Sequence, residues 1–398
     1  MTSLLVIIVL VLLAVALWQL TKIFDLTQVG SYSDDSQVAS DNDNNIQGYI
    51  MFGFLAFIYI FTIYGLLKWG GLALHTPASE HGLLVDNLMN ITWVLIFVVQ
   101  FITQGLLYWF SFKNRGNKDK KALFFADSNK LEAIWSIIPS VVLACLILYG
   151  LYAWNNIMFV DKDEDVIEIE LYAQQFKWTA RYAGQDNVLG KANVRLIEGI
   201  NTLGVDMSDP NSQDDIVVSE LHIPKGKKVH FKMRSQDVLH SAYMPHFRAQ
   251  MNCVPGMVTE FAFIPTYTTA EYRELPFMVE KVAHINKLRA EKSTELLAKG
   301  GGTALDPYTF DYLLLCNKIC GASHYNMQMK VVVDSPEDYK KWLSEKTTLA
   351  QDIKAAAAAE KPAEGAGVTT DSASTIVKDT VKTVVDTVKA AVAKVAMK

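Results

Sequence analysis

The chain has 398 residues, of which 51% are hydrophobic, and it carries a formal net charge of −5. This charge gives no support to nucleic-acid binding, which needs a strongly basic surface. Four cysteines are too few for a disulfide scaffold, and no Cys-x-x-Cys-His motif is present to attach a c-type haem to this chain. The hydrophobic residues are concentrated before about residue 155, and polar sequence with strand-like alternation follows.

Four N-terminal segments are predicted to cross a membrane as helices. Each holds about 20 mostly apolar residues, the length that spans the hydrocarbon core, where a helix satisfies every backbone polar group. The first segment could instead be a signal peptide, but it lacks a basic N-terminal region and its apolar run is longer than usual. We therefore expect a retained helix there. The segments are 1–23, 48–69, 90–112 and 133–154.

The basic residues predict the orientation of these helices. Cytoplasmic loops are enriched in Lys and Arg, and the loop between the third and fourth segments carries five Lys and one Arg. The fourth segment then ends outside, so the sequence after Trp154 is placed on the outer side. The loop 24–47 would also be cytoplasmic, although it is acidic and acidic residues contribute little to this rule. The basic loop residues are Lys113, Arg115, Lys118, Lys120, Lys121 and Lys130.

From Asp165 the sequence alternates with a period of two, as in DVIEIELYAQQFKWTARY, SELHIPKGKKVHFKMRS and MQMKVVVD. Short runs of this kind, separated by Gly, Pro and Asp, predict an antiparallel β-sandwich or barrel. Residues 183–217 and 281–306 do not fit this pattern. We expect both to be surface insertions, the second one partly helical.

After about Leu349 the composition changes again, and AAAAAEKPAEGAG is typical of a flexible linker. Beyond it, valines recur at helical spacing with Lys and Asp on the opposite face, which predicts an amphipathic helix. Two interpretations stay open: a marginal helix that is mostly disordered when free, or one that docks on a partner or the membrane surface. The valines are Val377, Val381, Val384, Val388, Val392 and Val395.

The stretch CNKICGASHYNM gathers two thiols, an imidazole and a thioether. A disulfide between Cys316 and Cys320 would leave His324 and Met327 unexplained. Zinc would accept the thiolates and the imidazole, but a thioether is a poor zinc ligand. A mononuclear blue-copper site uses two His, one Cys and a weak axial Met, and has no need of a second thiolate. Two thiolates that bridge a pair of copper ions, with one histidine for each ion, suit the pattern best.

A two-copper site requires a second histidine, and DVLHSAYMP offers His240 at the end of a predicted strand. A cupredoxin sandwich brings such a strand end next to the cysteine loop. The remaining histidines of the outer domain lack a comparable context and are interpreted as structural or surface residues. They are His222, His230, His246 and His284.

The cysteine loop, DVLHSAYMP-x-FR followed by VPG, and LEAIWSIIP in the last membrane segment resemble subunit II of haem–copper cytochrome c oxidases. The resemblance covers roughly residues 90–345, with the motifs in the family's order. It implies a membrane-anchored α+β fold with N-terminal transmembrane helices and a cupredoxin-like antiparallel β-sandwich or barrel. The parts would be two additional transmembrane helices (1–89), a transmembrane hairpin packing on subunit I (90–155), the cupredoxin-like domain (156–348), and a linker with an amphipathic tail (349–398).

The resemblance also implies a dinuclear copper A centre in the outer domain. Carried over residue by residue, His240 and His324 each bind one copper ion. Cys316 and Cys320 bridge both ions, and Met327 is the weak ligand of one of them.

Lys318 would supply the weak ligand of the other ion through its backbone carbonyl, which does not depend on the side chain. The family usually has Glu at this position, and that carboxylate helps to hold a magnesium ion at the boundary with subunit I. A lysine therefore puts the possible magnesium ion in doubt.

The resemblance implies the electron-accepting subunit of a respiratory terminal oxidase. Electrons would come from cytochrome c or another c-type haem partner and pass to the haems of subunit I, where O2 is reduced and protons are pumped. Subunit III and membrane lipid are further implied partners, and no nucleic acid is expected. The implied location is the bacterial inner membrane, with the copper domain on the periplasmic side. The alternative is a copper-free subunit II of a quinol oxidase, but all five side-chain ligands are retained.

Three further residues receive roles from the resemblance. Phe176, in QQFKWTARY, occupies the position where electrons arrive, and Trp178 follows two residues later. Glu132 lies at the cytoplasmic mouth of the last membrane segment, where the family has a proton-uptake Glu. A lone Glu at this depth could equally face lipid headgroups.

Overall fold

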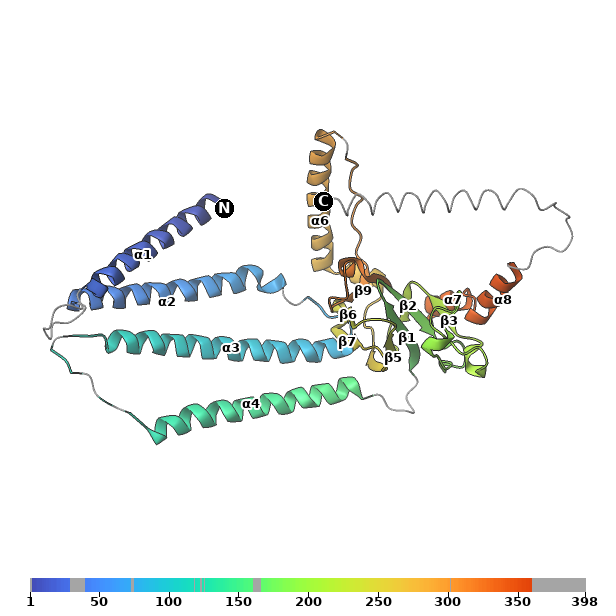
Figure 1. Ribbon diagram of the computed structural model, residues 1–398, viewed down its shortest axis with the longest axis horizontal. Coiled ribbons are helices and arrows are strands. Elements are labelled where there is room, and N and C mark those ends of the chain that lie inside the picture. Colours follow the sequence, from blue (N-terminus) through green and yellow to red (C-terminus); the bar gives the residue numbers. More distant parts are fainter. Residues whose placement is uncertain are drawn as a thin grey trace, which may run out of the picture. The chain divides into compact units, whose positions relative to one another are not determined.

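The computed structural model describes residues 2–28, 40–72, 75–117, 119–121, 124, 126–159, 166–300 and 302–359. The chain divides into two compact units, each made of two separate stretches of the sequence. One unit combines Met1–Leu189 with Ile216–Lys346, and the other combines Gly190–Asp215 with Thr347–Lys398. The first unit contains the apolar helices and the two β-sheets (Figure 1).

Within the described residues, three helices of the first unit are long and apolar enough to cross a membrane: Asp41–Leu72, Glu80–Lys113 and Asn129–Met158. They contain α2 (Asp41–Trp69), α3 (Glu80–Lys113) and α4 (Asn129–Met158). These three confirm the predicted second, third and fourth segments, and all extend beyond the predicted bounds. The first segment also forms a helix, α1 (Thr2–Gln28), whose described apolar stretch, Ile8–Thr21, is shorter.

Serine caps explain why the three long helices begin before their apolar runs. The hydroxyls of Ser40, Ser79 and Ser128 each accept a backbone N–H from the first turn of α2, α3 and α4. Such a cap satisfies a donor that has no partner inside the helix. The polar first turns are therefore helical although hydropathy alone does not include them.

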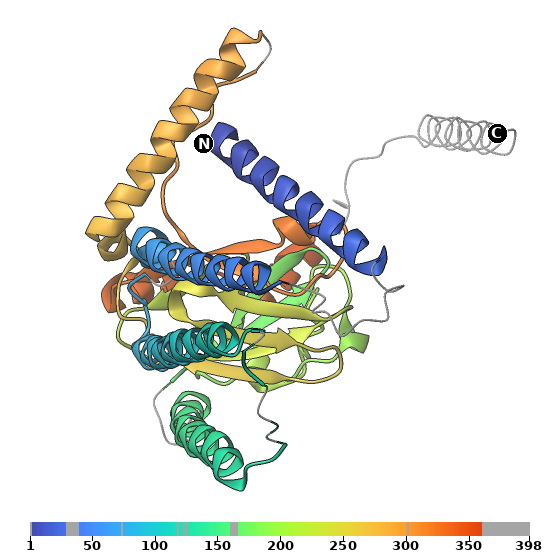
Figure 2. The same ribbon diagram turned by 90° about the vertical axis from the view of Figure 1, so that its left-hand side faces the viewer.

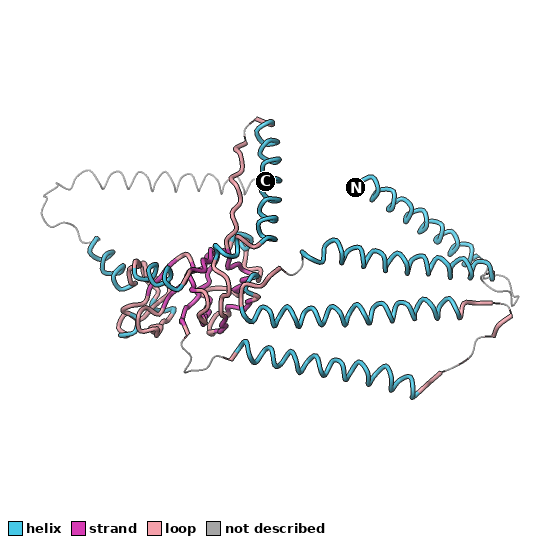
Figure 3. The backbone as a smooth tube through the Cα atoms, turned by 180° about the vertical axis from the view of Figure 1, so that it is seen from behind, coloured by secondary structure: helices cyan, strands magenta, loops and turns pink. Residues whose placement is uncertain are grey.

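The first unit also contains two five-stranded sheets, in the orders β3-β2-β1-β5-β8 and β4-β10-β9-β6-β7. In Figure 3 the strands lie together, beyond one end of the long helices α2, α3 and α4. Most pairs are antiparallel, as predicted, but β1–β5 and β10–β4 are parallel. The strands are β1 Ile167–Gln174, β2 Lys177–Tyr182, β3 Ile216–Val218, β4 Leu221–Pro224, β5 Val229–Ser235, β6 His240–Met244, β7 Ala249–Cys253, β8 Thr259–Phe263, β9 Tyr312–Cys316 and β10 Gln328–Asp334.

The core lies between the two sheets, because alternate side chains of each strand face inward. Leu171 of β1, Phe231 of β5 and Val331 of β10 are all fully buried in one continuous cluster. Cys320 and Met327 of the cysteine loop belong to the same cluster. The loop is thus anchored in the hydrophobic core, and the predicted cupredoxin-like sandwich is confirmed.

Hydrogen bonds join the outer end of α3 to the segment that follows β6. The guanidinium of Arg248 donates to both carboxylate oxygens of Asp86, over 2.7 and 2.9 Å. The Ser79 hydroxyl donates to the Phe247 carbonyl over 2.6 Å. A bidentate Arg–carboxylate pair also fixes relative orientation. Helix α3 and the segment that follows β6 are therefore held in a defined relative orientation.

The predicted insertion near residue 281 is a long helix. After α5 (Thr269–Arg273), α6 runs from Pro276 to Ala298 and extends away from the strands (Figure 2). The chain returns along it, with the Asn286 side chain donating to the Tyr308 carbonyl over 3.1 Å. Helix α7 (Pro336–Ser344) follows the last strand.

The second unit contains Gly190–Asp215, most of the other predicted insertion (183–217). This part includes two short 3-10 helices, Val194–Leu196 and Pro210–Ser212. The prediction of a flexible linker from Leu349 is wrong for Leu349–Ala359, which form helix α8. Alanine has the highest helix propensity, and it dominates this segment. The Leu349 N–H also donates to the Asp215 carbonyl over 2.8 Å. The predicted amphipathic tail lies outside the described residues.

Candidate metal centre

Strand register brings the two halves of the predicted ligand set together. His240 is the first residue of β6 and Cys316 the last residue of β9. These strands pair antiparallel, with Ala242 opposite Cys316, so the start of one meets the end of the other. Residues 317–327 then form the loop between β9 and β10. Its two ends are closed by the Cys316 N–H, which donates to the Met327 carbonyl over 3.1 Å.

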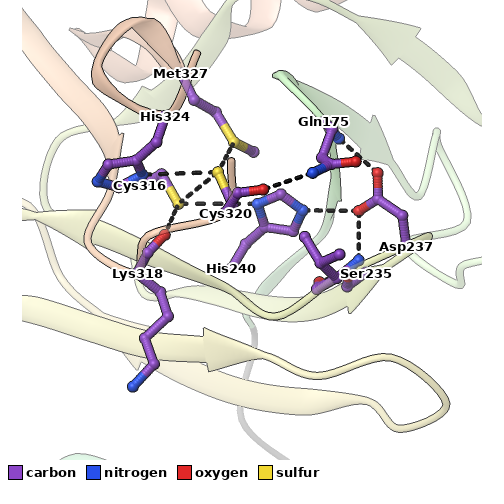
Figure 4. A network of polar contacts seen from close by, with 10 residues as sticks. Gln175, Ser235, Asp237, His240, Cys316, Lys318, Cys320, His324 and Met327 are labelled. Atoms are coloured by element: carbon purple, nitrogen blue, oxygen red, sulfur yellow. Dashed lines mark hydrogen bonds and ion pairs between the residues drawn. The ribbon is translucent and has the colours of Figure 1, made fainter. Parts of the chain in front are cut away.

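Five side chains come together at one place (Figure 4). Two of them are Cys316 and Cys320, whose sulfurs lie 3.9 Å apart. Each sulfur has its own imidazole nitrogen: His240 Nδ1 is 3.8 Å from Cys316 Sγ, and His324 Nδ1 is 3.6 Å from Cys320 Sγ. Met327 Sδ lies 3.8 Å from Cys320 Sγ. The donor atoms of His240 and both cysteines all lie within 4.8 Å of one another. Donor atoms at this spacing could hold a metal ion, and all five side chains named here offer nitrogen or sulfur.

The same geometry excludes the disulfide interpretation for this structure. A disulfide needs sulfurs about 2.05 Å apart, and both cysteines are free. Burial, followed by the effect of neighbouring Cys316, raises the pKa of Cys320 to about 11. A thiolate is the form that binds metal, so a cation in this cluster would have to displace the proton.

Lys318 faces the donor cluster with its backbone carbonyl and not with its side chain. The Lys318 carbonyl oxygen lies 3.2 Å from Cys316 Sγ, whereas the side chain is exposed and extends away from the cluster (Figure 4). The carbonyl thus faces the same space as the cysteine and histidine donors.

Sequence reasoning missed two residues that hold the donors in place. Asp237 Oδ1 lies 2.8 Å from Nε2 of His240, and Gln175 donates its side-chain N–H to the Cys320 carbonyl over 2.5 Å. Burial opposes ionisation of Asp237, but hydrogen bonds, first from the Gln175 backbone N–H and then from His240, hold its pKa below the usual range. The sequence shows Asp237 three residues before His240, as Asp-x-x-His, but no sequence pattern indicates a role for Gln175.

The comparisons with known proteins agree on one family. Residues 67–152 match the family model described as cytochrome C oxidase subunit II, transmembrane domain. The alternative cytochrome c oxidase subunit 2 of Bradyrhizobium diazoefficiens is 33% identical over 278 residues, which cover 69% of this chain and 84% of that protein. The chain belongs to the cytochrome c oxidase subunit 2 family. It is therefore part of an oxidoreductase complex, and its three membrane-length helices make it a multi-pass membrane protein.

More distant relatives show the same family name. Cytochrome c oxidase subunit 2 of Thermostichus vulcanus is 23% identical, covering 69% of this chain and 78% of that protein. The crystal structure of the periplasmic domain of subunit II of cytochrome oxidase from Bradyrhizobium japonicum is 18% identical and covers 47% of this chain and 95% of that chain, with a TM-score of 0.26. A score this low carries no argument about the fold, which rests on the two sheets described above.

The two aromatic residues singled out in this subunit 2 have different environments. Trp178 is buried in the core with 3% of its surface exposed, and its ring centroid is 6.3 Å from that of His240. Phe176 is only partly buried and its ring lies against Gly321 of the cysteine loop. Phe176 is therefore the one of the two that lies closer to solvent.

Glu132 lies in the first turn of α4, at the end opposite the β-sheets, and is exposed among the described residues. Ile157 and Met158, at the other end of α4, pack against the sheet core. A helix of 30 residues is about 45 Å long. Glu132 and the metal centre are consequently separated by the length of a membrane span.

The other histidines of the outer domain lie apart from the cluster. His222 contacts Asp334 over 2.6 Å and stacks on Trp342, and His230 contacts Glu168 over 2.8 Å. Burial lowers the pKa of His246 to about 4. His284 is exposed on α6. The structure gives none of them a place beside the cysteine sulfurs.

Proposed function

We propose that this chain accepts electrons at a dinuclear copper centre and passes them to the haems of oxidase subunit I. The observation that carries the proposal is the pairing of each cysteine sulfur with one imidazole, around two sulfurs 3.9 Å apart. Soft thiolate, thioether and imidazole donors favour copper, and no carboxylate is among them. The proposed ligands are His240, Cys316, Cys320, His324, Met327 and the Lys318 carbonyl.

When bound, copper would supply a one-electron redox couple, and the two cysteine sulfurs would be among its ligands. The protein's part is to hold the donors in place and to shield most of them from water. His240 is fully buried, and Met327 and Cys320 expose only 1% and 5% of their surface. Because the donors are fixed by strand ends and hydrogen bonds, they move little when an electron arrives or leaves. Small rearrangement favours fast transfer.

Electrons are proposed to arrive near Phe176, whose ring contacts the cysteine loop and reaches the partly exposed surface. Trp178 is proposed to assist from inside, beside His240. The donor would be a cytochrome c or a c-type haem protein held in a larger assembly. Subunits I and III are the proposed partners in the membrane, with the O2 chemistry in subunit I.

Glu132 is proposed to take up protons from the cytoplasm. It is exposed in the first turn of α4, next to the basic loop that predicts a cytoplasmic position. With this orientation, the metal domain lies on the periplasmic side of a bacterial inner membrane.

We also propose that the chain has four functional parts, 1–89, 90–155, 156–348 and 349–398. The first boundary falls inside α3, which begins at Glu80. The copper-free quinol oxidase alternative has no observation in its favour, because the complete donor set is present and convergent. Metal analysis of the purified oxidase complex tests the choice: copper bound to this chain supports electron acceptance, and its absence supports the alternative.

A further inference from the structure

Gln175 touches both segments that carry the metal donors. It lies in the turn between β1 and β2, next to Phe176. Its side-chain N–H donates to the Cys320 carbonyl over 2.5 Å, and its backbone N–H donates to Asp237 Oδ2 over 2.7 Å. The second oxygen of Asp237 contacts His240 Nε2. One residue is thus connected to a bridging cysteine and, through Asp237, to a histidine (Figure 4).

These contacts cross from one sheet to the other. Strands β1 and β2 belong to the first sheet, whereas β6 and β9, which carry His240 and Cys316, belong to the second. The side chains of Cys320 and Met327 anchor the loop after Cys316 in the core. The Gln175 hydrogen bond adds a contact from the opposite sheet to the backbone carbonyl of Cys320, one of the two proposed bridging residues.

Close packing beside this hydrogen bond supports a specific role. Gly321 has a φ of +142°, which disfavours other residues, and a Cβ there would lie 2.9 Å from Gln175 Nε2 and from the Phe176 ring. The loop therefore approaches the β1–β2 turn as closely as the absence of a side chain at Gly321 allows. An exposed glutamine that merely satisfied a carbonyl would not need such an approach.

We infer that Gln175 is a positioning residue of the metal centre, holding the Cys320 carbonyl through its amide and the His240 ring through Asp237. The inference rests on the proposed copper-binding function. Groups beyond the ligands orient them and tune the metal. Because the Asp237 contact uses the backbone, a substitution at Gln175 removes the contact to Cys320 selectively.

The test compares the wild-type oxidase complex with Gln175→Met, which keeps the length of the side chain and loses the amide. We expect copper still to bind, with an altered copper hyperfine pattern and midpoint potential, and loss of copper to a chelator about 10-fold faster. Gln174→Met is the matched control, since Gln174 is adjacent and its Oε1 has no hydrogen-bond partner in the described part of the chain. The control should behave as wild type.

Gln175→Asn, which keeps the amide on a shorter side chain that cannot reach Cys320, is the second variant in case Gln175→Met does not fold. Wild-type spectra, potential and copper retention in whichever variant folds would overturn the inference. A wild-type complex that carries no copper on this chain would overturn the proposed function as well. If the wild-type complex shows the copper signal and the folded variant shows the same signal, only the inference about Gln175 is overturned.

Discussion

Nε2 of His240 lies 2.8 Å from Oδ1 of Asp237, which leaves Nδ1 as the ring nitrogen that faces Cys316 Sγ at 3.8 Å. The carboxylate accepts a hydrogen bond from the Nε2–H group and thereby fixes both the tautomer and the ring orientation. His240 is fully buried, so water does not compete for this position. A lone pair is consequently directed into the space between the ring and the sulfur.

Replacing Asp237 by Ala should weaken copper binding by about 10- to 100-fold, because the imidazole loses the group that orients it. Copper competition titrations against a chelator measure this change. Asp334→Ala is the control, since Asp334 makes a similar contact to His222, which lies outside the donor cluster. Equal copper affinity in Asp237→Ala and in wild type would contradict the orienting role.

Cys320→Ser should abolish the spectrum of a mixed-valence copper pair, because one of the two bridging sulfurs is removed.

Met327→Leu should keep both ions but shift the midpoint potential, since a weak thioether ligand tunes the site more than it holds the metal. Electron paramagnetic resonance and redox titration separate the two results. Cys145→Ser, in α4, is the control and should change neither. A normal pair spectrum in Cys320→Ser would refute the bridging assignment.

Glu132→Gln should slow turnover of the oxidase while electron transfer from the donor to the copper centre keeps its wild-type rate. The reason is distance: Glu132 lies in the first turn of α4, and the opposite end of this helix packs against the β-sheets that carry the donor cluster. Stopped-flow reduction of copper, compared with steady-state O2 consumption, measures both steps. If copper reduction slowed in proportion to turnover, Glu132 would be a structural residue.

The exposed Lys318 side chain points away from the donor cluster. We propose that its ammonium group replaces a divalent ion at the boundary with oxidase subunit I. We expect the purified complex to lack a tightly held Mg²⁺ beside the cysteine loop, and Lys318→Glu to restore one, because a carboxylate is a preferred ligand of Mg²⁺. Metal analysis with Mn²⁺ as a spectroscopic substitute measures this. Stoichiometric, slowly exchanging Mn²⁺ in the wild-type complex would refute replacement.

The sequence predicted the donor cluster because its chemistry is local. Cys316, Cys320, His324 and Met327 occupy one loop, and only His240 had to be added from a distant strand. The alternation of apolar residues likewise predicted β1, β5 and β10. The parallel pairing of β1 with β5 was not predictable, because alternation of side chains is the same in parallel and antiparallel strands of a sandwich.

Gln175 escaped prediction because its partner, Cys320, is 145 residues away and the contact uses a backbone carbonyl. No residue type at position 320 signals such a bond. Helix α8 was missed for a different reason: the alanine run was interpreted by its low complexity, while its helix propensity favoured the structure that formed.

The measurement that tests the central claim most directly is the copper content of the purified full-length chain, with its electron paramagnetic resonance spectrum. The convergent donors predict two copper ions per chain and a spectrum in which one unpaired electron couples equally to both nuclei. A single copper ion with hyperfine splitting from one nucleus, or a chain that binds no copper, would contradict the account.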